Sequence, residues 1–233
     1  MKGTLYGVGV GPGDPELMTL KAVKTIEGCD IIAVPDTGKT ERVALEIAKQ
    51  AVGGLERKKV VEVHMPMTRN RETLDRFHDR AAEELIAYLD EGNNVAFLTL
   101  GDPTIYSTYM YVHKRVLKTG RSAKIVPGIP SFCAVAARLN ISLVEGGQPL
   151  HVIPASYEKT EEGLGLEGTK VLMKTGKAFG EVRELLKKKG AMKCAKMVQR
   201  CGMERERVFD SLEDADESAS YFSVILVKEE ETV

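Results

Sequence analysis

The sequence predicts an α/β protein of two domains: a mostly parallel, doubly wound sheet, followed by a mixed-sheet α/β domain. Apolar strand-like runs alternate with amphipathic helix-like stretches about five times in the first part of the chain. The second part has several candidate strands but one long candidate helix, too few helices to cover a parallel sheet. A segment at 142–149, with two glycines and a proline, looks like a linker. We therefore expect domains at 1–145 and 146–233, with the active-site cleft between them.

The elements of the first domain follow from local patterns. Thr4–Val10 is an apolar run closed by Gly-Pro-Gly, which is typical of a buried strand. Asp14 and Thr19 are candidate caps for the helical pattern that follows. Further strands are expected at 30–34 (ended by Pro35), 60–63, 94–100 and 122–126, and helices at 41–52, 70–91, 109–117 and 130–139.

The second domain is predicted in the same way. Its candidate strands are 150–154, 170–174, 195–198, 207–209 and 221–227, and its one long helix is 178–189.

Composition excludes several classes of protein. The net charge of −1 gives no field that would attract nucleic acid, and no run approaches the roughly 20 apolar residues of a membrane span. The four cysteines form no C-x-x-C pair and the four histidines no ligand motif, so no metal site is expected. The chain starts in a strand pattern, so we expect no signal peptide. We also expect a cytoplasmic protein with reduced thiols.

Three loops rich in glycine and proline each follow an apolar strand: residues 11–15, 101–103 and 127–131. Ligands of doubly wound sheets bind beyond the carboxyl ends of the strands. Three such loops therefore indicate one ligand cleft, although each alone could be a tight turn. Asp102 has the same two interpretations, a turn former or a ligand contact, and its place after a buried strand favours the contact.

The first loop does not fit a nucleotide fingerprint. In a G-x-G-x-x-G motif, Pro12 or Asp14 would stand where the third glycine belongs, and no G-K-[ST] of a P-loop follows. A nucleotide-binding oxidoreductase is therefore the weaker alternative. A cofactor-binding protein without catalysis also stays open.

Arginines cluster at 69–80, within MTRNRETLDRFHDR. One interpretation is a solvated helix face whose arginines pair with Glu72, Asp75 and Asp79, and the pattern alone slightly favours it. The other is recognition of carboxylates, which the planar guanidinium suits.

The three loops, in this order and spacing, resemble the tetrapyrrole methylase family of cobalamin and siroheme synthesis. The motifs are GVGVGPGDPELMTLKA, LTLGDPTIYSTY and VPGIPSFCAVAA. The segments MPMTRNRETL and YFSVILV are closest to the subgroup that methylates carbon 20 of precorrin-2 or cobalt-precorrin-2. The resemblance implies a homodimer that transfers methyl groups from S-adenosylmethionine, yielding S-adenosylhomocysteine, to a small-molecule tetrapyrrole. Other steps of the family, on precorrin-4 or uroporphyrinogen, are the alternative within it.

The resemblance also implies site residues. The expected cofactor contacts are Pro12, Leu100, Gly101, Asp102, Ile105, Pro130 and Ser131, with Met173 and Gly202 from the second domain. The expected substrate contacts are Gly11, Gly13, Asp14, Lys39, Arg42, Arg69, Arg71 and Arg76; the basic residues among them are candidates because the substrate is a polycarboxylate.

The catalytic residues stay open. Methyl transfer needs positioning more than acid catalysis, and the candidates for a base that removes a proton afterwards are Tyr106 and Asp102. Related uroporphyrinogen methylases carry an aspartate at the end of the second strand, where this chain has Pro35 followed by Asp36. We therefore do not assign that aspartate's chemistry to this chain.

Overall fold

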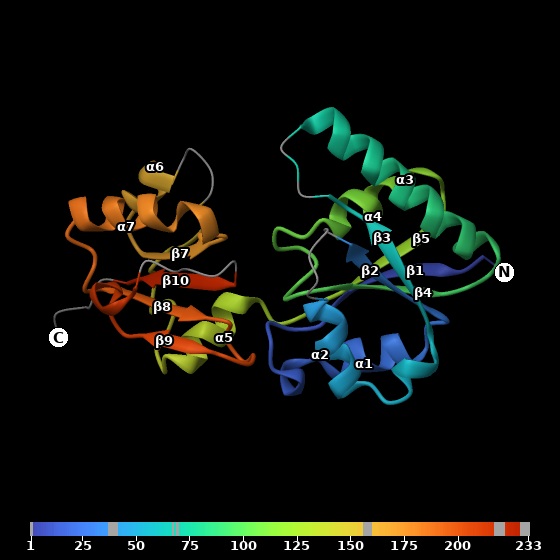
Figure 1. The fold of residues 1–233 in the computed structure, drawn as a ribbon, viewed down its shortest axis with the longest axis horizontal. Helices are drawn as coiled ribbons and strands as arrows, with labels where there is room; N and C mark the ends of the chain where they lie inside the picture. The colour runs from blue at the N-terminus through green and yellow to red at the C-terminus, as the bar shows by residue number, and fades with distance from the viewer. Residues whose placement is uncertain are drawn as a thin grey trace. The chain divides into compact units, whose positions relative to one another are not determined.

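The computed structural model describes residues 2–36, 42–66, 68, 70–155, 160–216 and 222–228. The chain divides into two compact units, Met1–Pro130 and Ser131–Val233 (Figure 1). This division falls earlier than the expected boundary after residue 145. The expected domains, 1–145 and 146–233, stay a prediction.

The first unit has a five-stranded sheet in the order β3-β2-β4-β1-β5, and every neighbouring pair is parallel. This confirms the predicted parallel sheet. The strands are β1 (Thr4–Gly9), β2 (Ile31–Asp36), β3 (Lys59–His64), β4 (Val95–Thr99) and β5 (Ser122–Val126).

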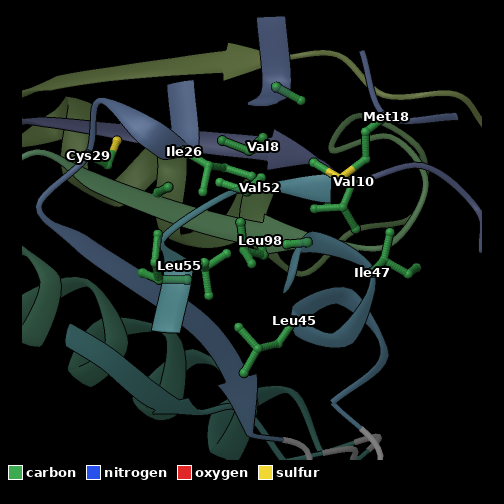
Figure 2. Close-up of a cluster of buried hydrophobic side chains, with 14 of the residues drawn as sticks. Val8, Val10, Met18, Ile26, Cys29, Leu45, Ile47, Val52, Leu55 and Leu98 are labelled. Carbon is green, nitrogen blue, oxygen red and sulfur yellow. The ribbon is translucent and has the colours of Figure 1, made fainter. Parts of the chain in front are cut away.

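Helices cover both faces of this sheet, with α1 and α2 on one side and α3 and α4 on the other (Figure 1). Alternate residues of β4 therefore enter different cores: Ala96 and Leu98 pack toward α1 and α2, and Val95 and Phe97 toward α3 and α4. Figure 2 shows the first of these cores around Val8, Val10 and Leu98. The helices are α1 (Leu20–Glu27), α2 (Val43–Ala51), α3 (Arg71–Asp90) and α4 (Tyr109–Lys118), with the short 3₁₀ helices η1 (Pro15–Leu17) and η2 (Leu55–Arg57).

Most helix boundaries agree with those predicted from the sequence. The carboxylate of Asp14 accepts from Glu16 N–H, Thr19 caps α1 through Ala22 N–H, and Asn70 caps α3 through Thr73 N–H. The predicted end of the second strand at Pro35 is wrong, because β2 continues to Asp36. Pairing with β4 ends at Ala33, and beyond it β2 pairs only with β3, so proline is tolerated there.

The second unit has a five-stranded mixed sheet in the order β6-β7-β10-β8-β9, as the sequence predicted. Among the neighbouring pairs of the described strands, β6 and β7 are parallel, and the pairs β7–β10, β10–β8 and β8–β9 are antiparallel. Leu172, Phe179 and Ile225 are among its core residues. The elements are α5 (Ser131–Arg138), β6 (Leu150–Pro154), α6 (Thr160–Leu164), β7 (Thr169–Met173), η3 (Gly176–Ala178), α7 (Phe179–Lys188), β8 (Ala195–Gln199), β9 (Arg207–Phe209), η4 (Leu212–Asp214) and β10 (Ser223–Val227).

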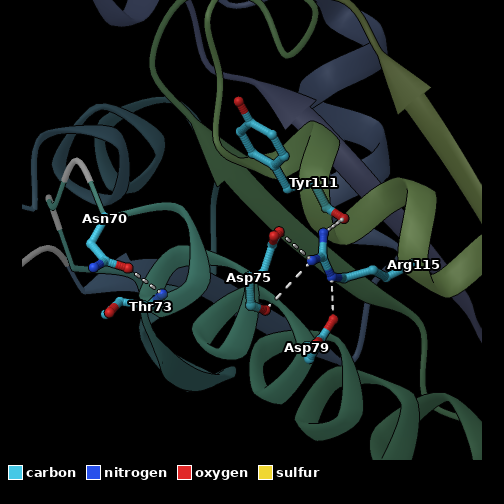
Figure 3. A network of polar contacts seen from close by, with 6 residues as sticks. All are labelled: Asn70, Thr73, Asp75, Asp79, Tyr111 and Arg115. Atoms are coloured by element: carbon cyan, nitrogen blue, oxygen red, sulfur yellow. Dashed lines mark hydrogen bonds and ion pairs between the residues drawn. The ribbon is translucent and has the colours of Figure 1, made fainter.

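Arg115 of α4 joins α4 to α3. Its Nε donates to Asp79 at 2.6 Å and its Nη2 to Asp75 at 3.0 Å, while its Nη1 donates to the carbonyl of Tyr111 (Figure 3). One interpretation of the sequence expected Asp75 and Asp79 to pair with the neighbouring arginines of α3. In the structure, both pair with Arg115 of α4 instead.

No helix in the described ranges combines the length and hydropathy needed to cross a membrane.

Gly7 gives a test of the packing between β1 and α4. A Cβ at Gly7 would lie 2.0 Å from the ring of Tyr109, which is fully buried. We expect Gly7→Ala to lower the free energy of unfolding by about 1–3 kcal/mol through overpacking. Urea denaturation measures this. The matched control is Gly53→Ala, whose Cβ would meet nothing within 4 Å. Equal midpoints for the two variants would contradict this packing.

Candidate functional site

The loops that follow β1 and β4 are joined to each other. Gly101 N–H donates to Gly11 O at 2.8 Å, and Gly11 N–H donates to Gly101 O at 3.4 Å, which makes a short antiparallel bridge. Both glycines have positive φ, +78° and +70°, a conformation that costs other residues energy. Two loops that were separate in the sequence thus form one structure at the carboxyl edge of the sheet.

Asp102 joins the third loop to this pair. The residue is 7% exposed, and its Oδ2 accepts from Gly128 N–H at 3.0 Å. Its Oδ1 accepts from the N–H of Thr104 at 2.7 Å and also from the Thr104 hydroxyl. The carboxylate therefore shapes its own loop and holds the loop after β5 against it.

The three loops approach so closely that only glycine fits. A Cβ on Gly128 would lie 2.1 Å from Gly101 O, and one on Gly9 would lie 2.5 Å from the same oxygen. Because those neighbours are backbone atoms, neither clash can be relieved by a side-chain rotation. A further contact comes from Thr19, whose hydroxyl donates to Pro127 O at 3.4 Å.

The expected cofactor residues of the first unit lie on or beside these loops. Pro12 and Gly13 are buried next to Gly11; Leu100, Ile105 and Pro130 are half-buried. Asp14 uses a carboxylate oxygen to accept from Glu16 N–H. Ser131 begins α5, where the second unit starts.

The expected residues of the second unit share one edge of its own sheet. Met173 ends β7, and Gly202 follows β8 in a turn with a φ of +70°. Because β7 and β8 are both antiparallel to β10, they run in the same direction and end at the same edge. Lys174, next to Met173, also has a positive φ of +58°, and burial lowers the pKa of its amine.

Tyr106 has an unusual backbone. Its φ is +51°, which is strained for a bulky residue, and it is 43% exposed. The residues just after it are held by hydrogen bonds: the hydroxyls of Thr99 and Ser107 lie 2.8 Å apart, and Ser107 Oγ accepts from Tyr109 N–H. Residues with a strained backbone are common at binding sites.

The predicted basic residues differ in their environments. Lys39 and Arg69 lie outside the described residues. Arg42 forms an ion pair with Glu62. Arg71 and Arg76 are exposed on α3 and have no ion pair within the part of the chain that the structure describes. They are therefore available to an anionic ligand.

Sequence reasoning missed one polar pair at the same edge. Asp36 ends β2, His64 ends β3, and Asp36 Oδ2 lies 3.0 Å from His64 Nδ1. The available signal was a polar residue at the end of each of two strands, but their pairing depends on strand register, which the sequence does not reveal.

The second unit has a hollow of its own. A hollow of about 720 Å³ along α7, lined by Phe179, Arg183 and Met192 among others, includes none of the expected site residues. Within the described ranges, no group of three or more His, Cys, Asp or Glu side chains could hold a metal ion.

The carboxyl edge of a parallel sheet, where these joined glycine loops lie, is where doubly wound α/β proteins bind their ligands. The family model described as Tetrapyrrole (Corrin/Porphyrin) Methylases matches residues 4–216. The chain belongs to the tetrapyrrole methylase family.

Individual relatives agree with this assignment. The chain is 37% identical to a probable cobalt-precorrin-2 C(20)-methyltransferase of Methanocaldococcus jannaschii, over 96% of this chain and 95% of the relative. It is 35% identical to the cobalamin biosynthesis protein CobIJ of Mycobacterium bovis, over 97% of this chain, but it spans only 46% of that protein's length. A uroporphyrin-III C-methyltransferase of Thermus thermophilus, solved with S-adenosylhomocysteine, has a TM-score of 0.70 at 19% identity, covering 97% of this chain and 98% of its own. This likeness shows the shared fold.

Asp102→Ala tests the connection between the second and third loops. The change leaves Gly128 N–H without its acceptor, so we expect a loss of about 1–3 kcal/mol in unfolding free energy. Hydrogen exchange at the Gly128 amide should become faster. The control is Asp14→Ala, which removes only a local cap and should leave that amide unchanged. Unaltered Gly128 exchange in Asp102→Ala would contradict this role.

Proposed function

We propose that this protein is an S-adenosylmethionine-dependent C-methyltransferase of cobalamin (corrin ring) biosynthesis. It methylates carbon 20 of precorrin-2 or cobalt-precorrin-2 and releases the (cobalt-)precorrin-3 product and S-adenosylhomocysteine. The observation that carries the proposal is the joining of three glycine loops at one edge of a parallel sheet, in a chain of the tetrapyrrole methylase family. The M. jannaschii relative, similar over nearly its whole length, supports the choice of carbon 20.

The side chains at the proposed cofactor site suit an adenosine. Leu100 and Ile105 follow β4 in the first unit, Met173 ends β7 in the second unit, and all three are half-buried apolar residues. The glycine loops of the first unit also have backbone amides and carbonyls. Such mixtures of apolar surface and a few polar groups are typical of cofactor sites. We propose that Pro12, Gly101, Asp102, Pro130, Ser131 and Gly202 complete the site, with domain 146–233 supplying the part around Met173.

S-adenosylmethionine supplies a methyl group on a sulfonium, whose departure as a neutral thioether needs no acid. The main task of the chain is therefore to hold two ligands in line, which can lower a barrier by roughly 7–11 kcal/mol. Loops with fixed backbones serve this task, because little of their freedom remains to be lost on binding. Asp102 acts here as a positioning residue.

The tetrapyrrole is a polycarboxylate, and charge-assisted hydrogen bonds from arginine are the expected means of binding it. Arg71 and Arg76 support this role because they are exposed and have no competing ion pair among the described residues. Gly11, Gly13 and Asp14 would face the macrocycle, and Lys39, Arg42 and Arg69 would add positive charge. We further propose that the protein acts in the cytoplasm as a homodimer.

The direct test is turnover. The protein is incubated with precorrin-2, with and without cobalt, and a carbon-13-methyl donor. We expect one new methyl signal, which carbon-13 NMR places at carbon 20. A methyl group at another carbon would contradict the proposed specificity, and no transfer to any tetrapyrrole would contradict the proposed reaction.

Arg71→Ala tests substrate recognition. We expect the KM for the tetrapyrrole to rise about tenfold or more, corresponding to a lost charge-assisted hydrogen bond, while the affinity for S-adenosylhomocysteine holds. Steady-state kinetics and calorimetry measure the two. The matched control is Arg57→Ala, because Arg57 is an exposed arginine of η2, which directly precedes β3 and so lies at the amino end of that strand. If Arg71→Ala leaves KM unchanged, Arg71 belongs to a solvated face.

A further inference from the structure

Asp36 and His64 form a polar pair that has no part in the proposed cofactor site or the proposed substrate contacts. They are the last residues of β2 and β3 and lie opposite each other in the parallel register. Asp36 Oδ2 is 3.0 Å from His64 Nδ1, and the ring of Phe77 packs edge-on against the imidazole, with centroids 5.1 Å apart. The ring of His64 is thus held from two sides.

The strand directions place this pair at the same edge of the sheet as the glycine loops. Ala33 is the last residue of β2 that pairs with β4, opposite Phe97, and both strands run on from there toward the carboxyl edge. Gly9 pairs with Thr99, so the loop that begins at Val10 and Gly11 starts at the same level on β1. Asp36, three residues beyond Ala33, therefore lies at the carboxyl edge from which the loop after β4 also starts.

The pair has a defined proton arrangement. An ionised carboxylate can only accept hydrogen bonds, so Nδ1 of His64 must carry the proton and donate it to Asp36. In the neutral imidazole, Nε2 then holds a free lone pair. Nε2 has no hydrogen-bond partner among the described residues, and the His64 side chain is 56% exposed. A basic nitrogen is therefore open at the ligand edge of the sheet.

The groups around His64 come from three elements. From β2, Asp36 faces it directly. Glu62, on β3 itself, is neutralised by Arg42. From α3, the uncharged ring of Phe77 packs against the imidazole.

Methylation of a ring-bridging CH carbon needs such a base. After the methyl group is added, that carbon holds one hydrogen too many for the conjugated bridge, and the proton has to be removed. The two candidates from the sequence fit less well: both oxygens of Asp102 accept hydrogen bonds in a 7% exposed site, and the phenol of a tyrosine is protonated near neutral pH.

We propose that His64 is the general base of the reaction and that Asp36 positions it, an inference that rests on the proposed function. Carbon 20 forms a bond to the methyl carbon while the S–CH₃ bond breaks and its electron pair stays on sulfur. Nε2 of His64 then takes the proton from carbon 20, and the C–H electron pair restores the double bond of the bridge. No oxidant or reductant is needed.

The test compares His64→Ala, His64→Gln and Asp36→Asn with the wild-type protein. We expect both His64 variants to lower kcat about 10²–10⁴-fold, with KM and S-adenosylhomocysteine affinity within twofold. Added imidazole should partly restore His64→Ala but not Asp36→Asn. With deuterium at carbon 20, a primary isotope effect should appear in His64→Ala, because proton removal becomes the slow step.

The matched control is His151→Ala in the second unit, where the imidazole forms a hydrogen bond with the Glu167 carbonyl. The kcat of this variant should equal that of the wild-type protein. Circular dichroism melting confirms that each variant folds, and His64→Gln retains bulk and polarity if the alanine variant unfolds. An unchanged kcat, or a raised KM alone, would overturn the assignment of His64. If the wild-type protein itself methylates no tetrapyrrole, the proposed function fails, which is a distinct result.

Discussion

The close approach of three backbone segments at Gly9, Gly101 and Gly128 is the constraint on which the candidate site depends. No side chain separates these segments, and Asp102 bridges two of them with its carboxylate. In a protein interior, backbone contacts of this kind can hardly relax without moving a whole strand end. The loops are therefore shaped before any ligand binds, as an enzyme that works by positioning requires.

The rest of the first unit holds these strand ends in place. Both faces of the sheet are buried under helices, and the cores on the two faces share β1, β2 and β4. The loop after β4 leads into α4, whose first residue is Tyr109. The ring of Tyr109 lies against Gly7 of β1, and its hydroxyl donates to Lys124 O of β5 at 3.0 Å. Burial raises the pKa of Tyr109, so this hydroxyl stays a donor. Arg115 then fixes α4 to α3.

The sequence predicted the fold well because its signals are local. Apolar runs closed by glycine and proline located the strands and loops, and Asp14, Thr19 and Asn70 cap helices as their positions indicated. Contacts between distant parts of the chain were missed. Asp36 and His64 are 28 residues apart, and Arg115 is 36 and 40 residues from its acids. For Asp102, the sequence indicated a turn former or a ligand contact but not the hydrogen bond to Gly128. That bond spans 26 residues and depends on the order of strands in the sheet.

The most direct measurement is calorimetric binding of S-adenosylhomocysteine to Gly128→Ala, beside the wild-type protein and Gly147→Ala, where an added Cβ meets nothing within 4 Å. The account predicts at least a tenfold loss of affinity for Gly128→Ala alone, because the added methyl group must push the third loop away from Gly101. Wild-type affinity in a folded Gly128→Ala protein would contradict the claim that these joined loops form the cofactor site.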